Sequence, residues 1–130
     1  MNDTPILGVL VAHGAMARGM VDAVAKIAGA DDAGIVPLSN EGVNPQVMVD
    51  RLNELVGDSP AVIFTDLTSG SCTMAAQITC RDNGHRVVVA GVNLPMLLDF
   101  VFNRSLPLEE LIPRLLERGQ AGVRSVPTFE

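Results

Sequence analysis

The chain has 130 residues and 48% hydrophobic content, which suits a single domain, residues 1–130, with one well-filled core. Its formal net charge of −6 argues against nucleic acid as a partner, because no basic patch is present to displace counterions from phosphates. The sequence has no apolar run of membrane-spanning length and no basic signal-peptide region at residues 1–4, so we expect a cytoplasmic protein without direct membrane insertion.

The first apolar stretch, residues 6–12, runs directly into His13 and Gly14. Val9 and Val11 are β-branched and no helix cap precedes the run, a pattern typical of a strand buried on both faces of a parallel sheet. His13 is therefore expected at the carboxyl end of a strand, where open α/β sheets bind their ligands. Gly14 has no side chain, so a ligand can approach the backbone closely there.

The rest of the chain alternates between helical and extended patterns. Apolar runs predict further strands at 34–38, 61–66 and 86–92. Helical spacing of apolar residues predicts helices at 17–28, 45–56, 72–82, 95–102 and 108–118. Asn44 and Asn93 read as N-caps, each with a proline at the start of the following helix.

The C-terminal part contains one conflict. Pro113 falls inside the last predicted helix and costs a helix interior about 3 kcal/mol, so we expect a kink or a break there. A turn at 119–122 and a short last strand at 123–126 are expected to follow.

The alternation predicts an α/β fold, an open, mostly parallel sheet of four strands with helices on both faces and a C-terminal antiparallel strand. Right-handed crossovers bring the carboxyl ends of the strands to one edge, and with them His13 and Asp66. The two residues lie on neighbouring strands if the first strand is flanked by the second and third.

Three features converge at this edge, namely His13, Asp66 and the loop Thr68-Ser69-Gly70-Ser71 before a helix. A helix N-terminus binds phosphate through its free N–H groups, and Gly70 permits a close approach. Asp66 would accept one ring N–H of His13, leave the other nitrogen free to take a phosphoryl group, and stabilise the cation so formed. Each feature is also common as a plain strand end, helix cap or turn, and on the residues alone that structural interpretation stays open.

Other chemistries find no support in the motifs. GxGxxG, GK[ST] and GxSxG are absent, which argues against dinucleotide binding, a P-loop and a serine hydrolase. Cys72 and Cys80 are not spaced as a metal motif, so no metal and no cofactor are expected. Cys72 is either a thiol with a pKa lowered by the helix start or an inert replacement.

Three motifs together resemble the enzyme IIA domain of the mannose/fructose/sorbose class of the bacterial phosphoenolpyruvate-dependent sugar phosphotransferase system. They are Val11-Ala-His13-Gly14, Phe64-Thr-Asp66 with Gly70-Ser71, and Ala90-Gly-Val-Asn-Leu-Pro-Met96. The resemblance implies that His13 takes a phosphoryl group from the histidine-containing phosphocarrier protein and passes it to an enzyme IIB component for sugar uptake. It also implies that Asp66 bonds this histidine, that Gly70 and Ser71 cradle the phosphate, and that a homodimer forms by exchange of the strand at 123–126.

The chain departs from the family pattern in the phosphate loop. Ser69 stands where a second glycine is usual, Cys72 where a proline is usual, and Leu67 where a hydroxyl residue is common. These differences bear on partner choice and on which sugar is transported. Two further functions stay open: a phosphorylation-dependent regulatory sensor not coupled to transport, and a phosphoryl donor resembling that of dihydroxyacetone kinase. The string at 91–96 favours the mannose class over the latter.

Overall fold

The computed structural model of the chain describes residues 5–81 and 83–129 and contains one four-stranded sheet. The strands are β1 (Leu7–Ala12), β2 (Ile35–Ser39), β3 (Ala61–Thr65) and β4 (Arg86–Ala90), in the order β2-β1-β3-β4. All three pairings are parallel. The condition that β1 lies between β2 and β3 is met. Because all pairings are parallel, every strand has its carboxyl end at the same edge of the sheet.

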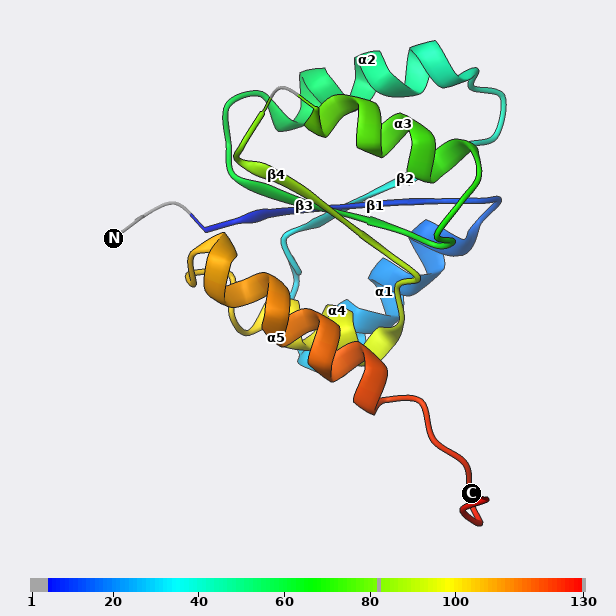
Figure 1. Cartoon of the computed structure of the whole chain (residues 1–130), viewed down its shortest axis with the longest axis vertical. Helices are drawn as coiled ribbons and strands as arrows, with labels where there is room; N and C mark the ends of the chain where they lie inside the picture. The colour runs from blue at the N-terminus through cyan, green and yellow to red at the C-terminus, as the bar shows by residue number, and fades with distance from the viewer. Residues whose placement is uncertain (1–4, 82, 130) are drawn as a thin grey trace.

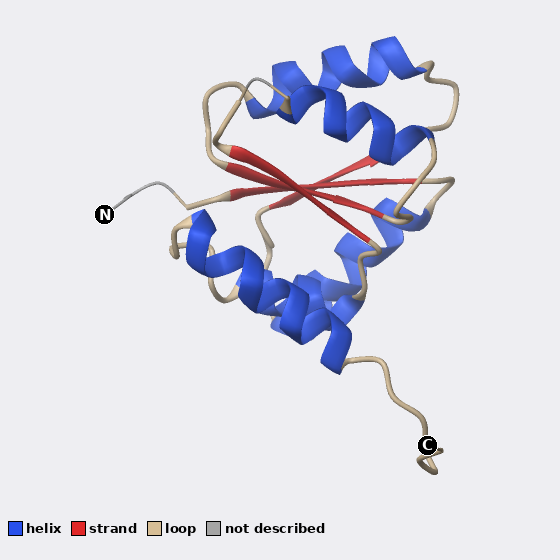
Figure 2. Ribbon diagram, in the orientation of Figure 1, coloured by secondary structure: helices blue, strands red, loops and turns tan. Residues whose placement is uncertain are grey.

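Helices cover both faces of the sheet (Figures 1 and 2). The helices α2 (Pro45–Val56) and α3 (Ser71–Cys80) lie on one face. The other face carries α1 (Met16–Ala28), α4 (Leu94–Val101) and α5 (Leu108–Ala121). The predicted end of α3 at Asp82 and the N-terminal residues 1–4 lie outside the described residues.

The strand β1 is buried on both sides, as its sequence predicted. Leu10 and Ala12 belong to the core beneath α1, α4 and α5, whereas Val9 and Val11 belong to the core beneath α2 and α3. A strand so enclosed is a rigid base for the residue that follows it, His13.

Both predicted asparagine caps are present. The side chain of Asn44 accepts a hydrogen bond from the Val47 N–H at 2.9 Å, and that of Asn93 accepts one from the Met96 N–H at 3.1 Å. Each satisfies a donor that the first turn of a helix leaves free.

Three C-terminal expectations were wrong, namely a break at Pro113, a turn at 119–122 and a last strand at 123–126. The helix α5 continues through Pro113 and through the predicted turn to Ala121. Proline removes one backbone hydrogen bond, and Leu111 and Leu115, both fully buried on either side of it, hold the helix against the core. Residues 123–126 form no strand, because α5 leads the tail away from the sheet and no strand of the described chain lies beside it (Figure 1).

Candidate functional site

The site residues His13 and Asp66 follow two neighbouring strands, β1 and β3, at their carboxyl ends. The His13 ring nitrogen Nδ1 lies 2.7 Å from Asp66 Oδ2, and the backbone N–H of His13 donates to the same oxygen at 2.9 Å. One carboxylate thus holds both the imidazole and the backbone that carries it.

The environment of the pair is asymmetric. The His13 side chain is 45% exposed, whereas that of Asp66 is 7% exposed. Burial acts to raise the pKa of Asp66, but the hydrogen bonds and charge of His13 outweigh it and hold this pKa below its ordinary value of 3.8. An ionised Asp66 accepts the proton on Nδ1, which leaves Nε2 of the exposed ring with the lone pair.

The loop between β3 and α3 faces the pair. Gly70 is the N-cap of α3, with φ 107° and ψ 179°, and a Cβ atom placed there would lie 4.0 Å from Cε1 of His13. Thr68, Ser69 and Ser71 are exposed beside it. All four predicted loop residues therefore lie at the His13 edge, where α3 begins.

Two buried hydroxyl groups, those of Thr65 and Thr73, connect the two ends of this loop. Thr73 donates to Thr65 Oγ1 at 2.8 Å and also bonds the carbonyl oxygen of Leu67. The Thr65 hydroxyl is itself 3.2 Å from that carbonyl. The backbone that carries Asp66 is thereby tied to the first turn of α3.

Two residues that the sequence did not reveal as part of the site, Ser39 and Asn40, hold the turn after His13 in place. The Asn40 side chain accepts a hydrogen bond from the Gly14 N–H at 3.1 Å, and the Ser39 hydroxyl donates to the Gly14 carbonyl at 2.8 Å. Ser39 is the last residue of β2 and Asn40 follows it, so a third strand contributes its carboxyl end to the site. The available signal was their polarity immediately after a strand.

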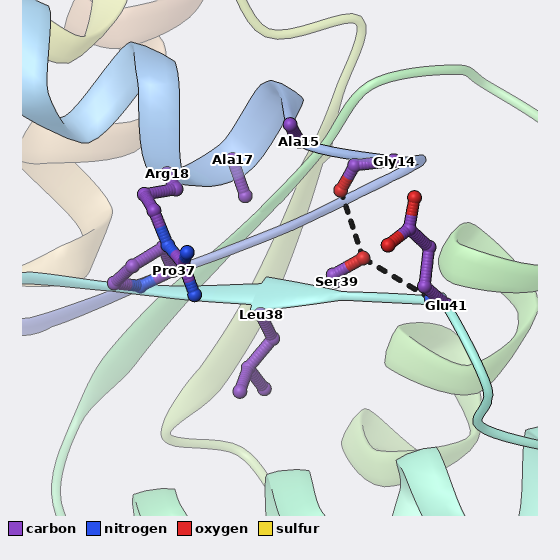
Figure 3. A pocket seen from close by; sticks show the side chains of 8 residues that line it. All are labelled: Gly14, Ala15, Ala17, Arg18, Pro37, Leu38, Ser39 and Glu41. Atoms are coloured by element: carbon purple, nitrogen blue, oxygen red, sulfur yellow. Dashed lines mark hydrogen bonds between the residues drawn. The ribbon is translucent and has the colours of Figure 1, made fainter.

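A pocket of about 150 Å³ lies behind this turn, between α1 and β2 (Figure 3). Gly14, Ser39 and Glu41 line one end, and Figure 3 shows Arg18 extending toward Pro37 and away from Gly14. His13 is not among the residues that line this pocket.

Cys72 lies directly behind the imidazole. Its Sγ is 3.8 Å from His13 Nδ1, and the residue is only 2% exposed. Burial and the Asp66 charge raise the pKa of this thiol, which favours the inert replacement over a thiol activated by the helix start. The donor atoms of His13, Asp66 and Cys72 all lie within 4.8 Å of one another.

Comparison with known proteins identifies the class. Residues 8–114 match the model of the family described as PTS system fructose IIA component, EIIA-man, and the chain belongs to this family of phosphotransferase-system enzyme IIA components. Comparison with curated sequences returned no match.

Solved structures share the fold. Phosphotransferase system component EIIA from Streptococcus agalactiae is 22% identical, with 94% of this chain and 98% of that chain covered and a TM-score of 0.86. The mannose/sorbose specific IIA subunit from Enterococcus faecalis is 24% identical, with 98% of each chain covered and a TM-score of 0.82. A PTS IIA protein associated with the fucose utilization operon of Streptococcus pneumoniae is 23% identical, with coverage of 95% and 96% and a TM-score of 0.76.

None of the helices in the described part of the chain has the length and apolarity needed to cross a membrane.

Proposed function

We propose that the chain is a phosphocarrier in which His13 accepts a phosphoryl group from the histidine-containing phosphocarrier protein and passes it to an enzyme IIB component. The observation that carries this function is the His13–Asp66 pair, a half-exposed imidazole whose Nδ1 is engaged by a buried carboxylate. The family to which the chain belongs supports the choice of donor and acceptor. These partners place the chain in the cytoplasm.

In the proposed transfer, the Nε2 lone pair of His13 attacks the phosphorus of the donor phosphohistidine. The N–P bond in the donor breaks as the new N–P bond forms, and the phosphorylated ring carries a positive charge while Nδ1 keeps its proton. Asp66 stabilises that charge through the 2.7 Å contact. Transfer to enzyme IIB runs the same exchange in the opposite direction, so positioning and charge are all that the site has to supply.

The N-terminus of α3 is the proposed binding site for the phosphoryl oxygens. The backbone N–H groups of the first turn have no helical acceptor, and the helix dipole favours an anion at this end. Gly70 brings this backbone close to the ring, and the hydroxyls of Thr68, Ser69 and Ser71 lie beside it in solvent. In this assignment the loop binds phosphate through backbone and hydroxyl donors and uses no cation.

Exposed apolar side chains next to the site favour a protein as donor and acceptor. Met16, Leu67 and Met74 are all exposed, and each lies within three residues of a site residue in the chain. Methionine and leucine at a surface adapt to differently shaped partners. We assign this rim to docking of the two partner proteins in turn.

The C-terminal tail is the proposed dimer element. Val123, Val126 and Phe129 are among the most exposed apolar side chains of the described chain, and β4 has a free edge because it pairs only with β3. A free edge and an apolar tail are complementary. We propose that residues 123–126 pair with β4 of a second copy.

Phosphorylation with a reconstituted donor tests the function. The chain is incubated with labelled phosphoenolpyruvate, enzyme I and the phosphocarrier protein, and acid-labile label on the chain is measured. We expect one phosphate per chain, lost in His13→Ala and kept in His85→Ala, which alters the other histidine in an exposed turn. Label that survives His13→Ala contradicts the site, absence of label contradicts the function, and label that no enzyme IIB removes favours the regulatory alternative.

A further inference from the structure

We propose that His13, Asp66 and Cys72 together bind one soft divalent cation of the zinc type. They form the one group of three metal-ligating side chains found in the described residues, with donor atoms all within 4.8 Å of one another. The three ligands come from the ends of β1 and β3 and from the first turn of α3. Because His13 lies 53 residues before Asp66 and only one ligand is a cysteine, the cysteine spacing could not reveal the group.

The second oxygen of Asp66 is an independent observation that favours a cation at this place. Oδ2 takes both hydrogen bonds from His13, whereas Oδ1 is buried and has no hydrogen-bond partner. The side chain is 7% exposed, so water satisfies little of it. Buried carboxylate oxygens are normally paired, and an unpaired one in a residue that clusters with a thiol and an imidazole suits a cation.

The distance between the sulfur and the imidazole nitrogen fits a tetrahedral ion. Zn–S bonds of about 2.3 Å and Zn–N bonds of about 2.05 Å at the tetrahedral angle separate sulfur from nitrogen by about 3.6 Å. The Cys72 Sγ to His13 Nδ1 distance is 3.8 Å. The 2.7 Å between Nδ1 and Oδ2 is too short for two ligands of one ion, which assigns Oδ1 as the ligating oxygen or requires a small shift of the carboxylate.

The donor set selects the class of cation. A thiolate and an imidazole favour zinc and similar ions over Mg²⁺ and Ca²⁺, which prefer all-oxygen sites. Three protein ligands leave a fourth position for water, the arrangement of an open zinc site. The imidazole is 45% exposed, so solvent reaches the ring of the site.

Metal binding also has a consequence that rests on the proposed phosphocarrier function. A cation on Nδ1 replaces the hydrogen bond to Asp66 and draws electron density from the ring, so Nε2 becomes a poorer nucleophile. We therefore expect metal-loaded protein to accept phosphate more slowly, with recovery after chelation.

Cobalt titration tests the site without any phosphoryl transfer. Co²⁺ is added to the full chain, and the near-ultraviolet charge-transfer band of a Co²⁺–thiolate bond is followed, with Zn²⁺ as competitor. We expect saturation at one ion per chain. Cys80→Ser, which alters the other cysteine, should keep the band, and Cys72→Ser should lose it.

Cys72 is buried, so Cys72→Ser could lose the band because it fails to fold. A second variant, at an exposed ligand, tests the site without this problem. His13→Gln removes an exposed ligand and should weaken binding by more than about 100-fold, since changes outside the ligand shell already cost 10–100-fold. A wild-type chain without a thiolate band, a band kept in folded Cys72→Ser, or unchanged affinity in His13→Gln overturns the metal site. If the wild-type chain is phosphorylated but binds no Co²⁺, the phosphocarrier function stands and the metal site is refuted.

Discussion

The carboxylate of Asp66 takes two hydrogen bonds from His13, one from the ring at 2.7 Å and one from the backbone at 2.9 Å, across 53 residues of sequence. The same contact orients the imidazole, selects its tautomer and ties the ends of two neighbouring strands. A change at Asp66 is therefore expected to act on chemistry and on stability together.

Asp66→Asn preserves the shape of the side chain and removes its charge. The amide cannot stabilise a cationic ring and no longer enforces the Nδ1 proton, so the initial rate of phosphorylation should fall on the order of 100-fold. Asp58→Asn, at an exposed position, serves as the matched control. Equal rates for the two variants would contradict the role of Asp66.

The lowered pKa of Asp66 predicts a pH-dependent contribution to stability. The folded-state pKa lies below its unfolded value, so the contribution is complete above the unfolded pKa and is lost as pH falls through the folded one. The difference in unfolding free energy between wild type and Asp66→Asn should be constant above about pH 5 and should shrink as the pH falls through 3.8 and then through the lower folded-state pKa. Denaturant titrations across this range measure it, and a difference independent of pH would contradict the assignment.

Gly70 has a backbone conformation that only glycine adopts easily, with φ 107° and ψ 179°. Gly70→Ala should lower the free energy of unfolding by about 1–3 kcal/mol, or move the loop and slow phosphorylation. The added Cβ meets His13 only at 4.0 Å, so backbone strain and not a clash is the cause. Gly84→Ala is the control, since nothing lies within 4 Å of its Cβ, and an equally small effect at both positions would argue against a strained cap.

The tail beyond α5 should be needed for assembly and not for folding. A chain ending at Gly122 loses, among the described residues, only exposed ones, so its thermal unfolding midpoint should change little. Its mass in solution should fall from dimer to monomer. Light scattering coupled to gel filtration gives the mass. A dimer that persists after truncation would contradict strand exchange through residues 123–126.

The sequence predicted the strands, the caps and the sheet edge because these depend on local signals. Asn44, Asn93 and the run before His13 each carry such a signal, and the structure confirms them. The strand order then brought His13 beside Asp66.

Other features depend on contacts that local patterns do not encode. Asn40 contributes to the site only because β2 lies beside β1, and Cys72 only because α3 begins under the imidazole. Pro113 was misjudged because a helix propensity takes no account of the core beneath Leu111 and Leu115. The tail at 123–126 has strand character but no partner strand within the described chain.

The position of the phosphoryl group on the ring tests the central claim most directly. The chain is labelled with ¹⁵N-histidine, phosphorylated through the phosphocarrier protein and studied by ³¹P and ¹⁵N NMR. We predict phosphate on Nε2 of His13, with Nδ1 protonated toward Asp66. Phosphate on Nδ1, phosphate on His85, or a His13 ring that stays unmodified with active donor proteins would contradict it.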